Sequence, residues 1–418
     1  MNVRLLSLSL LLIASSVATA GDWPRFLGPN GTGVSDEKGI PDSWKPENIL
    51  FKTAIPGKGH SSPIVSKGKV FLQTSSVDQS ERSLVCLDAM TGKILWQKKV
   101  PGGGAKTHQK SSPASNTPAA DGERIYAVFW DGSNQFLTAW DYDGKLLYNQ
   151  DLGKFVNEHG SGMSPVVVGD KIVLNNDQGN QMAKGPAHIQ AHDAKTGKLL
   201  WKKERDPERA SFATPFLLEK SDSGPEVIVA TTGGVSSYNP KDGAQNWHFV
   251  WKFDKNRLRT VGSPVFHQGL IFAIAGDGGG NRNMIALKAD GKGDVTNTAM
   301  VWQKKKGTAY VPSLVAKDGL VFWIDDKVNV VYCADAKTGN ELWNERLGGD
   351  SVSASPVIID GKLYVINEKG AVFVLNASKD LEVLAKNDLK EQVYASPAVA
   401  NGRMYIRTFD NLYCIGTK

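Results

Sequence analysis

The chain has 418 residues, of which 41% are hydrophobic and 22% are charged. This balance is ordinary for a globular protein and excludes disorder, collagen and coiled coil as the main architecture. The net charge of +6 is small for this length, and no lysine or arginine cluster concentrates it on one element, which argues against a nucleic-acid partner. Many Asp-Gly and Asn-Gly pairs predict numerous short strands joined by tight turns.

The first twenty residues have the pattern of a cleavable signal peptide. Arg4 supplies a positive charge, residues 5–13 are almost entirely apolar, and residues 18–20 (Ala-Thr-Ala) form a small-x-small cleavage site. The apolar run is too short to span a bilayer. No cysteine follows the cleavage site to carry a lipid anchor. We therefore expect a periplasmic or secreted mature chain that begins at Gly21 and has no transmembrane segment.

A phrase that begins with proline recurs at intervals of roughly 48 residues. Each copy has two or three β-forming residues, a turn with glycine and a second β run, which together predict a hairpin. Proline is tolerated at its head because the strand ladder has not begun there. Ser or Thr precedes the proline in every copy except Val311-Pro312-Ser313. The copies begin at Pro63, Pro118, Pro165, Pro215, Pro264, Pro312, Pro356 and Pro397.

A second phrase follows the hairpins and predicts two further strands. A third strand ends in Asp, Thr-Gly or Asp-Gly makes a turn, and a fourth strand carries a large aromatic residue. Four antiparallel strands in a unit of about 48 residues are typical of a propeller blade, so we predict an all-β, eight-bladed β-propeller over residues 49–418. The clear copies are 84–96, 189–201 and 331–343, and the weaker copies are 137–148, 235–247 and 284–302.

The two ends of the chain are expected to complete one blade together. After an N-terminal leader at residues 21–48, residues 49–57 match residues 94–102, the predicted outer strand of the first blade. The last copy stops after its third strand, at residues 412–415. We therefore predict that the N-terminal strand pairs with the last blade and closes the ring, which leaves no free sheet end.

Two residue positions recur within the second phrase and indicate packing. Cys, Ala or Ser fills one position in the third strand, which predicts a small buried side chain and free thiols rather than disulfides or metal ligands. A tryptophan recurs in the fourth strand, where it would pack between neighbouring blades. The cysteines are Cys86, Cys333 and Cys414, and the docking tryptophans are Trp96, Trp201, Trp247, Trp302 and Trp343.

The phrase Asp-Ala-Lys-Thr-Gly-Lys-Leu-Leu-Trp at residues 193–201 resembles the tryptophan-docking repeat of the PQQ-binding-like, or quinoprotein alcohol dehydrogenase-like, propellers. The resemblance runs from about Ile49 to the end. Residues 22–33, and 293–302 with 310–313, are similar to a secreted bacterial subfamily of these repeat proteins. A related branch is BamB, the normally lipid-anchored propeller of the outer-membrane assembly machine. The resemblance implies the propeller fold.

The resemblance does not extend to the residues of quinone chemistry. Dehydrogenases of this superfamily are expected to carry two adjacent cysteines in a disulfide ring, acidic and amide ligands for calcium, and a catalytic aspartate. This chain has no adjacent cysteines, and no segment matches the calcium-ligand pattern. We therefore expect no catalytic residues, no cofactor and no metal. The glycine-rich stretches 28–33 and 276–280 are interpreted as surface loops, because neither opens a helix after a strand.

One set of polar residues is expected to converge. The link from each outer strand to the next inner strand reaches one mouth of the axial channel, where binding residues commonly lie. A solvated rim without a ligand is the alternative. The side chains of this set are cationic or neutral, so the set would favour an acidic or carboxylated ligand. The residues are His60, His108, His159, Arg209, Arg259, Tyr310 and Tyr394, with Ser353 and Asn116 nearby.

Two functions remain open from the sequence. The first is an exported, non-catalytic propeller, expected as a monomer, that binds a protein or a cell-envelope component. A sensor whose rim binds a small anion cannot be separated from it. The second is a dehydrogenase of alcohols or sugars that uses PQQ with calcium over the propeller axis.

Overall fold

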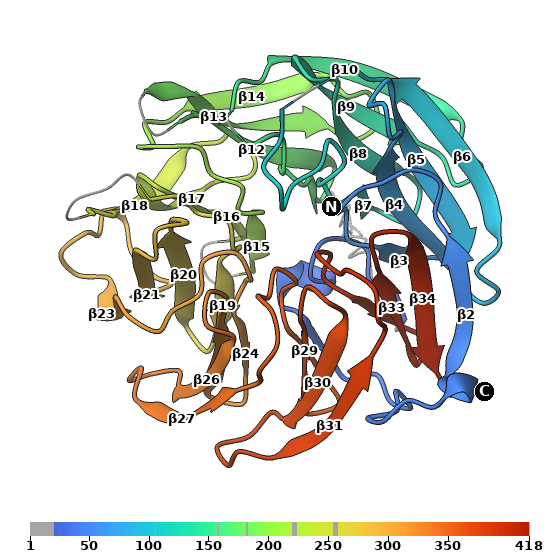
Figure 1. Cartoon of the computed structure of the whole chain (residues 1–418). Helices are drawn as coiled ribbons and strands as arrows, with labels where there is room; N and C mark the ends of the chain where they lie inside the picture. The colour runs from blue at the N-terminus through green and yellow to red at the C-terminus, as the bar shows by residue number, and fades with distance from the viewer. Residues whose placement is uncertain are drawn as a thin grey trace, which may run out of the picture.

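The structure, a computed structural model, describes residues 21–104, 106–157, 159–180, 183–219, 224–253 and 258–417, so the expected signal peptide lies outside it. The chain forms an eight-bladed β-propeller, as the repeat predicts. Eight sheets surround a central axis, and each contains four antiparallel strands (Figure 1). Two short 3-10 helices, η1 (Pro29–Gly31) and η2 (Pro46–Asn48), precede the first blade.

The first four blades follow one another along the chain. Blade 1 contains β3 (Ile64–Ser66), β4 (Lys69–Ser75), β5 (Glu81–Asp88) and β6 (Ile94–Pro101). Blade 2 contains β7 (Ala119–Ala120), β8 (Ile125–Trp130), β9 (Asn134–Trp140) and β10 (Leu146–Lys154). Blade 3 contains β11 (Val166–Val168), β12 (Lys171–Gly179), β13 (Lys184–Asp193) and β14 (Leu199–Glu204). Blade 4 contains β15 (Phe216–Leu218), β16 (Glu226–Thr231), β17 (Gly234–Tyr238) and β18 (Gln245–Val250), and β22 (Gly293–Asp294) joins its outer edge in parallel.

The remaining blades complete the ring. Blade 5 contains β19 (Val265–His267), β20 (Leu270–Gly276), β21 (Arg282–Lys288) and β23 (Met300–Lys304). Blade 6 contains β24 (Val315–Lys317), β25 (Leu320–Asp325), β26 (Val330–Asp335) and β27 (Glu341–Arg346). Blade 7 contains β28 (Val357–Ile359), β29 (Lys362–Ile366), β30 (Ala371–Asn376) and β31 (Val383–Asp388), and β1 (Val34–Ser35) joins its inner edge in parallel. Blade 8 contains β32 (Ala398–Ala400), β33 (Arg403–Arg407), β34 (Asn411–Gly416) and β2 (Ile49–Ala54).

Blade 8 combines strands from both ends of the chain. Strand β2 pairs antiparallel with β34, and Phe51 lies opposite Cys414. Figure 1 shows the blue β2 beside the red β34. This is the pairing that the match between residues 49–57 and 94–102 predicts. It covers the edge of β34, which would otherwise present unpaired backbone groups to solvent.

The Asp-Ala-x-Thr-Gly phrase forms a capped turn between the third and fourth strands. In blade 1 the Asp88 carboxylate accepts hydrogen bonds from Thr91 N and Thr91 Oγ1, both at 2.8 Å. The Asp335 carboxylate accepts the same pair from Thr338 at 2.7 and 2.8 Å. These hydrogen bonds hold the pKa of both aspartates below the ordinary value. Gly92, which closes the turn, has a φ of 72° that favours glycine.

The small residue of the third strand lies directly opposite the large aromatic of the fourth. Cross-strand partners share one face of a sheet, so a bulky aromatic leaves room only for a small side chain across from it. All three cysteines occupy such positions and are free and buried, which confirms the packing interpretation. The pairs are Cys86–Trp96, Ala139–Tyr148, Ala191–Trp201, Ser237–Trp247, Ala286–Trp302, Cys333–Trp343 and Cys414–Phe51.

Four of the recurring tryptophans join their blade to the next one through a hydrogen bond from Nε1. Trp96 donates to Tyr142 O at 3.1 Å, and three others donate at 3.0 Å. Those three pairs are Trp201–Pro240, Trp302–Ala336 and Trp343–Ser378. Trp247 differs, because its Nε1 donates to Glu226 Oε2 of its own blade at 3.2 Å.

The hydroxyl that precedes each inner strand joins the blades at the axis. The backbone N–H of the hydroxyl residue in one blade donates to the side-chain oxygen of its counterpart in the next. Seven junctions contain this bond, at 2.8 to 3.1 Å. The residues of this hydroxyl ring are Ser62, Thr117, Ser164, Thr214, Ser263, Ser313, Ser355 and Ser396.

The hydroxyl ring corrects the assignment of the sixth copy. Ser313 accepts from Ser263 N and donates its own backbone N–H to Ser355 Oγ, both at 2.9 Å. Leu314 therefore takes the proline position, and Pro312 lies two residues before it. The proline pattern misplaced this copy, because the hydroxyl group joins neighbouring blades and the proline ring does not.

The leader segment crosses the propeller axis. Trp23 exchanges two backbone hydrogen bonds with Val65 of blade 1, at 2.8 and 2.9 Å. Arg25 Nη2 donates to Pro215 O of blade 4 at 2.6 Å. The N-terminal segment is visible in blue at the centre of the ring in Figure 1. Gly28 is buried, and a Cβ there would lie 2.6 Å from the Trp23 ring, whereas Pro29 and Asn30 are exposed, so residues 28–33 are only partly the surface loop that the sequence predicts.

Candidate functional site

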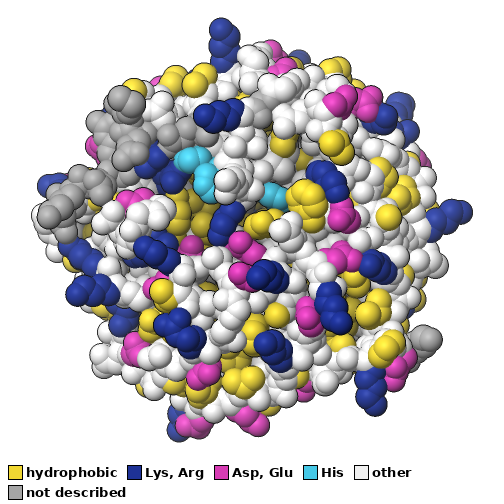
Figure 2. Space-filling view, in the orientation of Figure 1, with side chains coloured by type: hydrophobic (Ala, Val, Ile, Leu, Met, Phe, Trp, Pro, Cys, Tyr) yellow, Lys and Arg dark blue, Asp and Glu magenta, His cyan; other side chains and the backbone are white. Residues whose placement is uncertain are grey.

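A cavity of about 440 Å³ lies on the propeller axis. All eight members of the hydroxyl ring line it, and Phe26 of the leader lines it as well. Histidine side chains (cyan) lie near the centre of the face shown in Figure 2, with lysine and arginine side chains (dark blue) around them. The leader thus contributes to the wall of the cavity, although it belongs to no blade.

Six of the seven residues predicted for the rim line this cavity, and Ser353 joins them. Arg209 is not among the described lining residues: it is buried, and its backbone N donates to Thr232 Oγ1 at 2.8 Å. Asn116 is also buried, and its side chain donates to Val128 O at 2.9 Å. The six lining residues are His60, His108, His159, Arg259, Tyr310 and Tyr394.

Two of the histidines at the cavity, His60 and His108, have a pKa below the ordinary value. Burial, followed by the positive charge of Arg407, lowers the pKa of His60 to about 4. The His60 ring packs against Tyr394, with ring centroids 4.6 Å apart. Burial, followed by the charges of Arg259 and Lys110, also lowers the pKa of His108. Burial therefore favours the neutral form of both imidazoles, and the nearby cationic side chains add to this effect.

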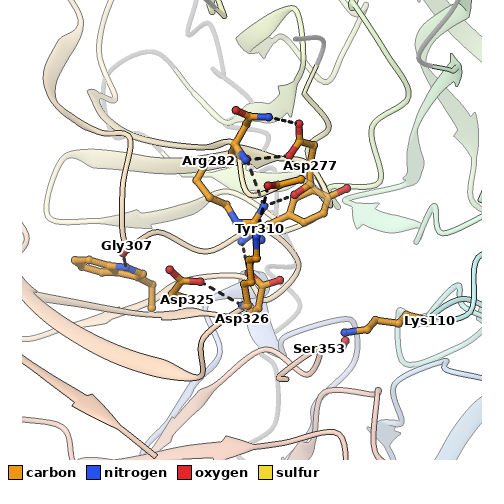
Figure 3. Close-up of polar contacts among 12 residues, drawn as sticks. Lys110, Asp277, Arg282, Gly307, Tyr310, Asp325, Asp326 and Ser353 are labelled. Carbon is orange, nitrogen blue, oxygen red and sulfur yellow. Dashed lines mark hydrogen bonds and ion pairs between the residues drawn. The ribbon is translucent and has the colours of Figure 1, made fainter. Parts of the chain in front are cut away.

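Two arginines flank one tyrosine on the side of blades 5 and 6. The Arg282 guanidinium lies 4.9 Å from the centre of the Tyr310 ring, and the Arg259 guanidinium lies 5.7 Å from it. Figure 3 shows how Arg282 is oriented. Its Nη1 donates to Asp277 O, and its Nη2 lies 3.7 Å from Asp326 Oδ1. Asp326 also accepts from Tyr310 N at 2.9 Å. This cluster is held in place by contacts at both terminal nitrogens of the Arg282 guanidinium.

A second charged group lies across the cavity from the arginine cluster. Lys110 Nζ contacts Glu368 Oε1 at 2.6 Å, and Ser353 Oγ donates to the same oxygen at 2.7 Å. Figure 3 shows Lys110 and Ser353 together, apart from Arg282. The Glu368 carboxylate is therefore engaged by two side chains that line the cavity.

The rim prediction missed the residues that come from the hairpin turns. Arg282 begins β21, and Asp326 follows the end of β25, so both lie at the turn between the second and third strands of a blade. This turn reaches the same mouth as the links between blades. Gly278, in the stretch interpreted as a plain surface loop, lines the cavity with them. The glycine-rich sequence at residues 276–280 was the feature that could have pointed to this turn as part of the cavity.

The residues present do not fit a calcium-bound quinone. Among the described residues, no group of three or more His, Cys, Asp or Glu side chains is placed to hold a metal ion. The carboxylates nearest the cavity, Asp326 and Glu368, are engaged by Arg282 and Lys110 respectively. The three cysteines are buried in the third strands of separate blades. We derive no catalytic step through the quinone.

The fold and its axial cavity define an eight-bladed propeller of docking-tryptophan repeats. Comparison with known protein families identifies the family to which the chain belongs. The family described as "Outer membrane protein assembly factor BamB" matches residues 44–128, 83–345 and 327–415, so the chain belongs to this family. The BamB of Yersinia pestis is 23% identical over 353 residues, which are 80% of each chain. The BamB of Burkholderia pseudomallei is 34% identical over 160 residues, 37% of this chain and 40% of that protein.

Solved structures share the fold at low identity. The BamB of Moraxella catarrhalis superposes with a TM-score of 0.61 at 15% identity, over 88% of this chain and 99% of that one. The quinohemoprotein alcohol dehydrogenase of Comamonas testosteroni superposes with a TM-score of 0.51 at 12% identity, over 97% and 82%. In the part of the chain that the structure describes, no helix combines the length and apolar character needed to cross a membrane.

Proposed function

We propose that this protein is an exported, non-catalytic propeller that binds a protein or a cell-envelope component at its axial cavity. The observation that carries the proposal is the convergence of polar side chains from separate blades on one cavity, with His60, His108 and Arg259 among them. Membership of the assembly-factor family supports the same role, since its named relatives are assembly factors of the outer membrane.

The proposed organisation has three parts. Residues 1–20 direct export and are removed, so the working protein is periplasmic or secreted. Residues 21–48 form a leader that packs across the axis, and residues 49–418 form the propeller. We expect the mature protein to act as a monomer, because the pairing of β2 with β34 closes the ring within one chain.

Site-specific photo-crosslinking tests the location. A photoreactive amino acid at Lys110, an exposed residue that lines the cavity, should capture a partner from the envelope of producing cells. The same amino acid at Lys145 is the matched control. Lys145 is exposed at the turn between β9 and β10, on the opposite face. Adducts confined to the Lys110 position support the proposal, and the same adducts from both positions contradict it.

A spectroscopic titration tests the dehydrogenase alternative. The purified mature protein is mixed with PQQ and calcium, and dye reduction is followed with alcohols and sugars. We expect no quinone-dependent turnover, because the nearby carboxylates Asp326 and Glu368 already have cationic partners. Retained quinone together with substrate-dependent dye reduction would establish the alternative.

A further inference from the structure

The base of the cavity offers a ring of hydroxyl donors. Seven members of the hydroxyl ring accept a backbone N–H from a neighbouring blade, as Ser62 does from Ser396 N at 3.0 Å. Accepting that bond leaves the hydroxyl proton of each residue free to be donated. Further hydroxyls line the cavity, and Ser111 and Ser351 are among them. The cavity can therefore pair with many ligand oxygens at once.

The described wall of the cavity carries more cationic than acidic side chains. Among the described lining residues, Asp326 is the only acid, and Arg282 already lies 3.7 Å from its carboxylate. The cationic lining residues are Lys110, Arg259, Arg282 and Lys327. A guanidinium binds a carboxylate through two parallel hydrogen bonds, which gives this wall a preference for carboxylated ligands.

Aromatic rings give the cavity apolar faces between its polar groups. Phe26, Phe212, Tyr310 and Tyr394 all line it. A cavity of about 440 Å³ is far larger than a single inorganic anion needs and lies within the ordinary range for small-molecule sites. The leader packs across the axis at Phe26, which blocks a polymer from threading through the ring and favours a ligand that enters by one end.

We propose that the cavity binds the end of an acidic saccharide, with a uronate carboxylate at the arginine side and sugar hydroxyls on the hydroxyl ring. Arg259 and Arg282 face the carboxylate, and Tyr394 packs against the C–H face of the sugar. An acidic peptide side chain would satisfy the arginines but leave most of the hydroxyl ring unpaired. This inference rests on the proposed function, because it names the ligand of the same cavity.

Calorimetric titration with defined probes tests the ligand class. We expect digalacturonate to bind the mature protein saturably, and the neutral disaccharide galactobiose to bind at least about tenfold more weakly, since it lacks the carboxylates. An acetylated peptide of two glutamates is the third probe and should bind more weakly than digalacturonate. Binding of the peptide without digalacturonate, or equal binding of both disaccharides, would overturn the inference.

Two variants connect the binding to the proposed wall. Arg259→Ala and Lys327→Ala should each weaken digalacturonate binding, by about tenfold or more for Arg259. Lys327 is exposed, so its removal leaves the blade core intact and serves as the test if Arg259→Ala impairs folding. Arg346→Ala, an exposed arginine on β27 outside the cavity, is the matched control and should bind as the parent does.

The outcome is separable from that of the crosslinking experiment. Adducts at Lys110 without uronate binding would remove the saccharide inference and leave the proposed function standing. Uronate binding that Arg346→Ala weakens as much as Arg259→Ala would place the saccharide elsewhere and overturn the inference.

Discussion

Ser396 donates its backbone N–H to Ser62 Oγ at 3.0 Å, although 334 residues separate them in the sequence. This bond belongs to the hydroxyl ring and joins blade 8 to blade 1 at the axis. At the outer edge of blade 8, β2 pairs with β34. Ring closure therefore has two components, one at the axis and one at the edge, and both depend on residues near the N-terminus.

Deletion of residues 21–57 should strongly destabilise the protein or cause it to aggregate. The deletion removes β2 and exposes the edge of β34, and it also removes the buried Trp23 and Leu27. Thermal unfolding and light scattering measure the effect. A truncated protein that melts like the parent would show that the pairing of β2 with β34 is dispensable.

Ser313→Ala should lower the free energy of unfolding by about 1–3 kcal/mol, because it leaves the buried N–H of Ser263 without an acceptor. Ser313→Thr keeps the hydroxyl and is expected to retain most of that stability. Pro312→Ala should matter less, since the proline is outside the hydroxyl ring. Denaturant titration ranks the three variants, and a larger loss for Pro312→Ala would contradict the corrected assignment.

Gly339→Ala should destabilise the protein more than Gly361→Ala. Both glycines have similar left-handed backbones, with φ of 71° and 72°, so the conformational strain is matched. A Cβ at Gly339 would lie 2.8 Å from the Trp302 ring of the preceding blade, whereas nothing lies within 4 Å at Gly361. We expect a difference of about 1–3 kcal/mol in the free energy of unfolding from overpacking. Equal losses would mean that Trp302 docking tolerates the methyl group.

The cysteines should resist labelling in the folded protein. Burial raises the pKa of Cys86 and Cys333 to about 12 and that of Cys414 to about 11, so little reactive thiolate forms at pH 8. Thiol labelling followed by mass spectrometry should find three free thiols after unfolding and almost none before it. A disulfide between any two of them would contradict the packing interpretation.

Acidification should cost stability through His60. Its pKa is about 4 in the folded state and near 6.5 when unfolded, so the unfolded state takes up the proton first. Stability is therefore lost as the pH falls from about 6.5 to 4, by about 3 kcal/mol at most. The change in melting temperature between pH 7.5 and 4.5 should be smaller in His60→Gln than in the parent.

His188 provides the comparison for that experiment. Burial lowers its pKa to about 4 as well, so His60→Gln should remove only part of the acid sensitivity. His188→Gln is expected to remove a similar part. An unchanged acid sensitivity in His60→Gln would show that His60 titrates normally in the folded protein.

The rim was predictable from the sequence because the repeat places its residues at equivalent positions. Six of the seven predicted residues line the cavity. Arg209 has the right position in the repeat but is buried beside Thr232, and no local pattern distinguishes it from Arg259. Arg282 and Asp326 were missed because they lie in hairpin turns, whose length and composition vary from blade to blade.

The sequence by itself determined the number of blades, the strand that completes the last one, and the small buried position in the third strands. Those features recur, and each copy depends on local alternation and turn chemistry. Only the tertiary structure decided that Ser313 rather than Pro312 joins the blades, that the leader packs across the axis, and that Arg282 meets Tyr310. These contacts join segments distant in the chain, and the leader has no second copy from which its packing could be inferred.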